Sequence, residues 1–149
     1  MKIFLDTNIF MEYVSCRSCY KYVSSIFDTI EDGKNSAVIS VGGIYTITYL
    51  LGRIFKQNDI HQPELNEKIR FSLNALLKLA ATVDCTSETV GAAINDEQFT
   101  DIEDSFQYHC ALQHDCDVLL TINIKDYKNV LDSELEVMTP QDFVEKYLK

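Results

Sequence analysis

Short apolar runs alternate with amphipathic segments along most of the chain. The apolar runs predict strands at residues 3–6, 37–40, 81–85, 117–121 and 135–138. Apolar positions three and four residues apart predict helices at about residues 20–30, 44–55, 63–77, 87–94 and 101–114, and Thr139-Pro140 begins a last helix. This alternation is typical of a parallel sheet with helices on both faces, so we expect an α/β fold with four or five strands.

Two helical segments allow a prediction of their buried faces. In residues 101–114, Ile102, Phe106 and Cys110 repeat every four residues, which predicts one buried stripe. In residues 44–55, Tyr45 and Tyr49 lie one turn apart, and we expect them to pack against the protein rather than to stack on bases.

Length and composition favour a single domain over residues 1–149. The chain is long enough for a full core, 46% of it is hydrophobic, and it has only five Gly and two Pro to supply linkers. No apolar run approaches the roughly 18 residues that cross a bilayer, and the first residues do not form a secretory signal. We therefore expect a cytoplasmic protein without a membrane partner.

The five cysteines agree with a reducing compartment. Their number is odd, and most lie within apolar patterns, as buried thiols do. Cys16 and Cys19 have the spacing of half a zinc site, but the sequence contains no second pair at metal-binding spacing. Two helix cysteines one turn apart are the simpler interpretation.

Charge is distributed unevenly. The net charge is −10, and residues 84–149 alone hold 15 acidic and 4 basic side chains. A nucleic acid would therefore be bound through local contacts or through metal ions that reverse the sign of an acidic pocket, because phosphate contacts need positive charge. The candidates for local contact lie in the middle of the chain: Arg53, Lys56, Lys68, Arg70 and Lys78.

Three groups of polar residues are candidates for chemistry. They are Asp6, Thr7 and Asn8 after the first strand, Asp101 and Asp104 near a helix start, and Thr121, Asn123 and Asp126 around the end of a later strand. The carboxyl ends of parallel strands share one edge of a sheet, where ligands bind, so these groups should converge. Clustered carboxylates suit Mg²⁺ or Mn²⁺, and such ions promote phosphodiester hydrolysis.

Simpler roles are open for two of these carboxylates. Asp6 precedes a mainly apolar segment and Asp101 precedes the helix of residues 101–114, so either side chain can serve as a helix N-cap. Asp104, in the first turn of the same helix, also gains from the helix dipole.

Four segments together resemble a PIN domain. They are Leu5-Asp6-Thr7-Asn8, residues 101–108 with Ala111 beyond them, residues 120–127, and residues 139–143. The likeness is greatest to the small, single-domain VapC-like members of bacterial toxin–antitoxin modules. It implies a three-layer α/β/α fold, a Mg²⁺- or Mn²⁺-dependent endoribonuclease that acts as a toxin, an RNA substrate, an antitoxin that blocks the site, and frequent homodimers.

The resemblance also assigns roles to individual residues. Asp6 matches the first metal ligand of the family, and Asp104 matches the acidic residue on the helix before the Thr-x-Asn strand. Asn123 stands where many members have a further carboxylate, and Asp126 matches the acid that commonly follows. Asp101, one turn before Asp104, is a candidate metal ligand that would compensate for a carboxylate that many family members have and this chain lacks. Thr7, Asn8 and Thr121 are candidates for substrate binding.

One position departs from the family pattern. Many members carry a Glu on the helix after the second strand, and here that place falls at about Gly43, with no carboxylate between Asp32 and Asp59. A PIN-fold protein with weakened or lost nuclease activity, acting as an RNA- or protein-binding module, is therefore the alternative.

Two other enzyme classes fit less well. A haloacid-dehalogenase phosphotransferase needs a second Asp two positions after the first, where this chain has Asn8. A response-regulator receiver needs an acidic pair after the first strand and an acceptor Asp after the third, and this chain has neither.

Overall fold

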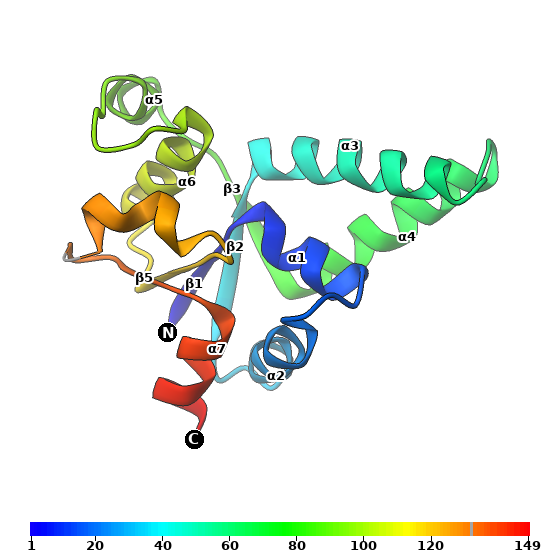
Figure 1. The fold of residues 1–149 in the computed structure, drawn as a ribbon, viewed down its shortest axis with the longest axis horizontal. Helices are drawn as coiled ribbons and strands as arrows, with labels where there is room; N and C mark the ends of the chain where they lie inside the picture. Colours follow the sequence, from blue (N-terminus) through cyan, green and yellow to red (C-terminus); the bar gives the residue numbers. More distant parts are fainter. Residues whose placement is uncertain (132) are drawn as a thin grey trace.

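Five short strands form a parallel sheet at the centre of the molecule. The computed structural model describes residues 1–131 and 133–149, with the strand order β3-β2-β1-β4-β5 (Figure 1). The strands are β1 (Lys2–Leu5), β2 (Ser36–Ser40), β3 (Ala80–Val83), β4 (Val118–Leu120) and β5 (Glu136–Met138). All neighbouring pairs are parallel, so the strands end at one common edge. The predicted α/β class and strand number are confirmed.

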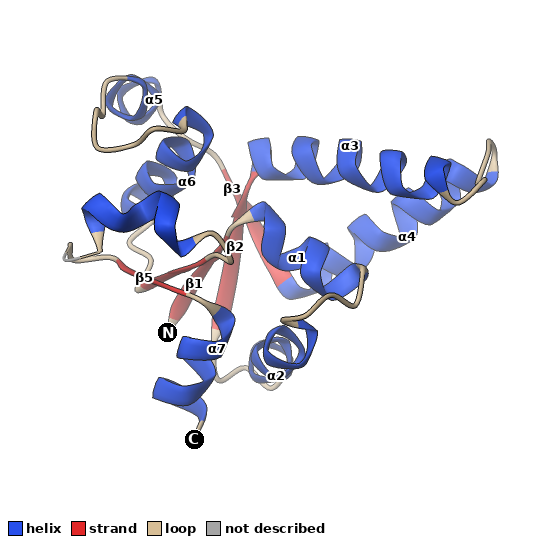
Figure 2. Cartoon of the chain, viewed as in Figure 1, coloured by secondary structure: helices blue, strands red, loops and turns tan. Residues whose placement is uncertain are grey.

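Helices cover both faces of this sheet, which gives three layers (Figure 2). They are α1 (Thr7–Val14), α2 (Tyr20–Glu31), α3 (Val41–Gln57), α4 (Glu64–Leu79), α5 (Ser87–Ile94), α6 (Ile102–Gln113), the 3₁₀ helix η1 (Ile124–Val130), α7 (Pro140–Phe143) and the π-helical turn η2 (Val144–Leu148). Alternation along β1 separates two cores: Ile3 and Leu5 pack with α1, α2 and α3, whereas Phe4 packs with Tyr108 of α6 and Tyr127 of η1.

The pair α3 and α4 extends away from the sheet (Figure 1). Leu51 of α3 and Leu76 of α4 are fully buried on the inner face of this pair. Tyr45 and Tyr49 lie on the outside of α3 and are 73% and 67% exposed, so the prediction that they pack against the protein is wrong. Their one-turn spacing identified a shared helix face correctly, but that face points to solvent. Among the described residues, no helix is both long and apolar enough to cross a membrane.

The face of α6 that is buried differs from the prediction. Cys110 is buried, but Ile102 and Phe106 are 54% and 37% exposed. The buried face instead includes polar Ser105 and Gln107. The Ser105 hydroxyl donates to the backbone carbonyl of Ala93 in α5 at 2.8 Å, which allows a polar side chain to lie in the interface between the two helices. The spacing of apolar residues did not predict this face, because part of it consists of polar side chains whose burial is stabilised by hydrogen bonds.

Most predicted boundaries differ from the structure by one to three residues. Strand β3 ends at Val83, which pairs with the last residue of β2, and not at residue 85. Helix α3 begins at Val41, three residues earlier than predicted, because the Ser40 hydroxyl accepts a hydrogen bond from the backbone of Gly43. The last helix begins at Thr139-Pro140 as predicted; Thr139 caps α7 and Thr86 caps α5, and each side chain accepts from a backbone N–H three residues later.

Candidate active site

Asp6 lies directly after β1, at the carboxyl edge of the sheet. Its backbone N–H donates to the carbonyl of Leu120 in β4 at 3.1 Å, which fixes it against the neighbouring strand. The residue is only 4% exposed. It occupies the N-cap position of α1, but its carboxylate makes no capping hydrogen bond to that helix. Capping therefore does not account for this side chain.

Hydrogen bonds from four side chains surround the Asp6 carboxylate. Thr121 Oγ1 donates to Oδ2 at 2.8 Å, and the Tyr127 hydroxyl donates to the same oxygen at 3.4 Å. Asn8 Nδ2 also reaches Oδ2, at 3.3 Å, and Thr7 Oγ1 reaches Oδ1 at 3.4 Å. Burial raises the pKa of Asp6, while the hydrogen bonds from Thr121, Thr7 and Tyr127 act in the opposite direction.

The residues around Asp6 also bind one another. Asn8 Nδ2 lies 3.4 Å from Thr121 Oγ1, and Asn8 Oδ1 accepts from the backbone N–H of Ile122 at 3.3 Å. Thr121 is fully buried and Thr7 is 8% exposed. These contacts make Thr7, Asn8 and Thr121 supports of Asp6, and no exposed part of Thr121 remains for the substrate contact that we predicted for it.

Asp104 brings a second carboxylate to the same edge. It lies in the first turn of α6 and is half-buried. Its pKa is raised to about 7, first by burial and then by the negative charges of Asp6, Asp101, Asp126 and Glu103. The carboxylates that the sequence predicted to converge therefore lie close enough for their charges to disfavour the ionisation of Asp104.

The other predicted site residues lie around this pair. Asp101 is exposed and is the N-cap of α6, with Oδ1 accepting from the Glu103 backbone N–H at 2.8 Å. Its capping role is confirmed, and its charge reaches Asp104. Asp126 is half-buried in η1, and Asn123 is exposed immediately before η1.

Comparison with known proteins identifies the family. The model of the PIN domain matches residues 2–125. The chain belongs to the PIN domain family. It is 23% identical to ribonuclease VapC1 of Aquifex aeolicus over 147 residues, which cover 98% of this chain and 95% of VapC1.

Solved structures have the same fold at low sequence identity. VapBC2 from Rickettsia felis, bound to a DNA fragment from its promoter, matches with a TM-score of 0.67 and 16% identity, covering 93% of this PIN domain and 98% of the matched chain. FitAB bound to the IR36 DNA fragment matches with a TM-score of 0.66 and 15% identity, covering 93% and 94%. A toxin–antitoxin complex from Klebsiella pneumoniae gives 0.62 and 17%, covering 93% and 97%.

Sequence reasoning missed Tyr127 as a functional residue of this PIN domain. Its ring is fully buried and packs edge-on against Phe99, with centroids 5.7 Å apart. Burial and the nearby carboxylates of Asp6 and Asp104 raise the Tyr127 pKa, so the hydroxyl stays protonated and remains a donor. The available signal was its position directly after Asp126, within a run already identified as part of the site.

Gly43 provides no carboxylate to the acidic site. A Cβ atom at this position would lie 3.1 Å from Ser40 Oγ and 3.3 Å from side-chain carbons of Ile39 and Thr7. Since Thr7 contacts Asp6, the start of α3 closely approaches the acidic pair but contributes no carboxylate.

The carboxylates that are present fit a cation site with few negatively charged ligands. Within residues 1–131 and 133–149, no cluster of three or more His, Cys, Asp or Glu side chains is placed to hold a metal ion. Asp6 and Asp104 still provide two carboxylates, and Mg²⁺ is usually bound by one or two carboxylates together with water. A divalent cation would also relieve the repulsion that, together with burial, raises the Asp104 pKa.

Proposed function

We propose that this PIN domain is a Mg²⁺- or Mn²⁺-dependent endoribonuclease and the toxin component of a toxin–antitoxin module. The observation that carries the proposal is the convergence of Asp104 and Asp6 at one edge of the sheet, where burial and then the negative charge of Asp6 raise the pKa of Asp104 to about 7. Structural ion-pair networks also perturb pKa values, but here the perturbed carboxylate is surrounded by like charges at the ligand-binding edge of a parallel sheet. The likeness to ribonuclease VapC1 supports the same reaction.

In this proposal Asp6 and Asp104 hold the cation, while Asp126 and Asn123 orient its water ligands. Asp101 caps α6 and adds negative charge near the cation, either from a distance or as a further ligand. When bound, a divalent cation lowers the pKa of a water molecule and stabilises the oxygens that attack and leave in phosphodiester hydrolysis.

The chain's own part is to fix Asp6 and to oppose, by hydrogen bonds, the effect of burial on its charge. Thr121 and Tyr127 both donate to Asp6 Oδ2, so the lone pairs of this oxygen are held toward protein donors. The other oxygen, Oδ1, has only the 3.4 Å contact from Thr7 among the described hydrogen bonds and remains the freer of the two. Ligand geometry therefore depends on buried hydroxyl groups as well as on the carboxylates.

An antitoxin with a basic segment is the expected inhibitor. Arg or Lys side chains placed among Asp6, Asp104 and Asp126 would form charge-assisted hydrogen bonds where the carboxylates repel one another. One of the solved structures of similar fold is a toxin–antitoxin complex from Klebsiella pneumoniae, which supports such a partner. A homodimer is a further expectation from the family resemblance.

Cleavage of single-stranded RNA with added Mg²⁺ or Mn²⁺ tests the proposal. We expect the wild-type chain to cleave and Asp6→Asn to lose about 100-fold or more of the rate, since several kcal/mol of charge stabilisation are removed. Asp28→Asn, at an exposed position of α2, is the matched control and should cleave normally. Addition of Mn²⁺ should also raise the Tm of the wild-type chain but not of Asp6→Asn, which gives a readout independent of catalysis.

A binding module is the second candidate function. Gly43 favours it, because the start of α3 reaches the site without bringing a carboxylate. RNA binding without cleavage at any Mg²⁺ or Mn²⁺ concentration, and without a Tm shift by metal, would support this candidate and contradict the nuclease.

A further inference from the structure

A cavity of about 330 Å³ lies beside the acidic pair, at the same edge of the sheet. Its floor is formed by the ends of β2 and β3, where Ser40 pairs with Val83. Strand β2 is the neighbour of β1, which ends next to Asp6, so cavity and carboxylates lie side by side along the edge. Helix α6 contributes to both, because Glu103 lines the cavity while the adjacent Asp104 faces Asp6.

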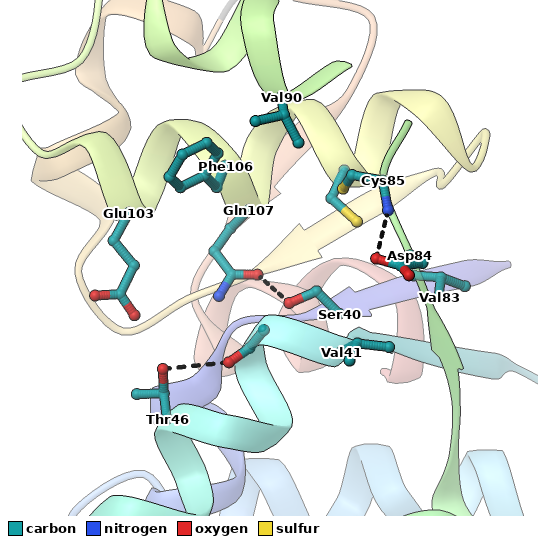
Figure 3. A pocket seen from close by; sticks show the side chains of 12 residues that line it. Ser40, Val41, Thr46, Val83, Asp84, Cys85, Val90, Glu103, Phe106 and Gln107 are labelled. Carbon is teal, nitrogen blue, oxygen red and sulfur yellow. Dashed lines mark hydrogen bonds between the residues drawn. The ribbon is translucent and has the colours of Figure 1, made fainter. Parts of the chain in front are cut away.

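The cavity combines apolar walls with a few polar groups (Figure 3). Val41, Val83 and Val90 supply aliphatic surface, and the Phe106 ring is 37% exposed beside them. The side chains of Glu103 and Gln107 lie one helical turn apart on α6 and both extend from it toward α3, and the Gln107 amide meets Ser40 (Figure 3). A flat, partly apolar ligand with polar edges fits such a lining.

Gln107 places an amide group at the cavity. Its side chain is 5% exposed, and Oε1 accepts a hydrogen bond from Ser40 Oγ at 3.1 Å. Ser40 Oγ itself accepts from the Gly43 backbone N–H at 2.9 Å, so its hydroxyl hydrogen is free for Gln107 and sets the amide orientation. Among the hydrogen bonds of the described residues, Nε2 of Gln107 has no partner, and it can donate into the cavity.

Glu103 adds the opposite hydrogen-bonding character. Its side chain is exposed at the cavity rim, and an ionised carboxylate only accepts hydrogen bonds. The pair Gln107 and Glu103 thus offers an amide donor beside a carboxylate acceptor. The Watson–Crick edge of guanine presents the complement, with O6 as acceptor and N1–H and the N2 amino group as two adjacent donors. Adenine and cytosine present one such donor group, and uracil presents only its N3–H.

We propose that this cavity binds an unpaired guanine of the RNA, next to the phosphodiester held at Asp6 and Asp104. Gln107 Nε2 donates to O6, the Glu103 carboxylate accepts from N1–H and N2–H, and the base lies against Phe106. The proposal rests on the proposed ribonuclease function for its substrate class. A base, and not a phosphate, is the fitting group because the cavity is lined by Glu103 and Asp84 and by no Lys or Arg.

Binding to short RNAs without catalysis tests this proposal separately from the nuclease activity. The Asp6→Asn chain in EDTA would be titrated into labelled five-nucleotide RNAs that carry guanine, inosine, adenine, cytosine or uracil in the centre and uracil elsewhere. We expect the guanine RNA to bind about 10-fold more tightly than the adenine, cytosine and uracil RNAs, as one bidentate base contact allows. Inosine, which lacks the N2 amino group, should bind less tightly than guanine.

Second variants assign the preference to the cavity. Adding Glu103→Gln should reduce the preference for guanine to less than 3-fold, while Glu97→Gln, at another exposed position, should leave it unchanged. Equal binding of all five RNAs, no binding of any of them, or a preference that survives Glu103→Gln would overturn the proposal. Guanosine monophosphate that competes as strongly as the RNA would also overturn it, by assigning the cavity to a free nucleotide.

Discussion

The Thr121 hydroxyl donates to Asp6 Oδ2 at 2.8 Å and thereby joins the ends of two neighbouring strands that are 115 residues apart in sequence. Both groups are buried, so water competes little for this hydrogen bond. The bond orients the carboxylate and favours its charged form against the effect of burial. Asp6, the proposed cation ligand, is thus held by a residue that does not itself reach the surface.

Replacing Thr121 should separate this positioning role from simple packing. Thr121→Val keeps the shape but removes the donor, so we expect the affinity for Mn²⁺ and the cleavage rate to fall about 10- to 100-fold. Thr121→Ser retains the hydroxyl and should recover most of both. Manganese affinity can be followed by calorimetry, and equal affinities for the Val and Ser variants would show that the hydroxyl does not position Asp6.

Asp104→Asn should stabilise the protein in the absence of metal. The folded-state pKa of Asp104 is raised from 3.8 to about 7, so folding opposes its ionisation, and the chain loses stability as pH rises between these values. Asn does not ionise and avoids this loss. Because Asp104 is about half-exposed, solvent screening limits the gain at pH 8 to about 1 kcal/mol, or about 2–4 °C in Tm for a chain of this size.

The same variant should respond differently to pH and to metal. Below about pH 3, where Asp104 is protonated in both the folded and the unfolded chain, the wild-type protein and Asp104→Asn should have similar Tm values in EDTA. With Mn²⁺ at pH 8, the wild-type Tm should rise and that of the variant should not. A variant that is less stable than the wild type at pH 8 in EDTA would contradict the repulsion inferred for this cluster.

Gly43 and Gly42 form a matched pair at the start of α3. Alanine at position 42 would meet nothing within 4 Å, so Gly42→Ala should stabilise the chain by about 0.5–1 kcal/mol through helix propensity alone. At position 43 the new methyl group would press on Ser40, Ile39 and Thr7. Overpacking of this kind usually costs about 1–3 kcal/mol, so Gly43→Ala should be the less stable variant in urea unfolding. Equal stability of the two variants would mean that α3 has room for a larger side chain beside Asp6.

The sequence was sufficient to predict what depends on strand order and local chemistry. Apolar runs gave the strands, and the rule that parallel strands end at one edge brought Asp6 and Asp104 together. It was not sufficient where burial depends on polar contacts across the fold. The hydrogen-bond partners of Gln107 and Tyr127 lie in other elements, 67 and 121 residues away. Gln107 is itself polar and Tyr127 follows a polar run in the sequence, so hydropathy gives no sign that either side chain is buried.

Asp101 can be tested for charge without loss of its cap. Asn is as good an N-cap as Asp, so Asp101→Asn should unfold at nearly the wild-type urea concentration, whereas Asp101→Ala should lose about 1 kcal/mol with the hydrogen bond to the Glu103 N–H. Both variants remove one negative charge near Asp104, and we expect each to weaken Mn²⁺ binding by about 2- to 5-fold, as a partly exposed charge does in solvent. Calorimetric titration with Mn²⁺ measures this directly. If Asp101→Asn bound Mn²⁺ and cleaved RNA as the wild type does, Asp101 would be a helix cap and would not compensate for the carboxylate absent at Gly43.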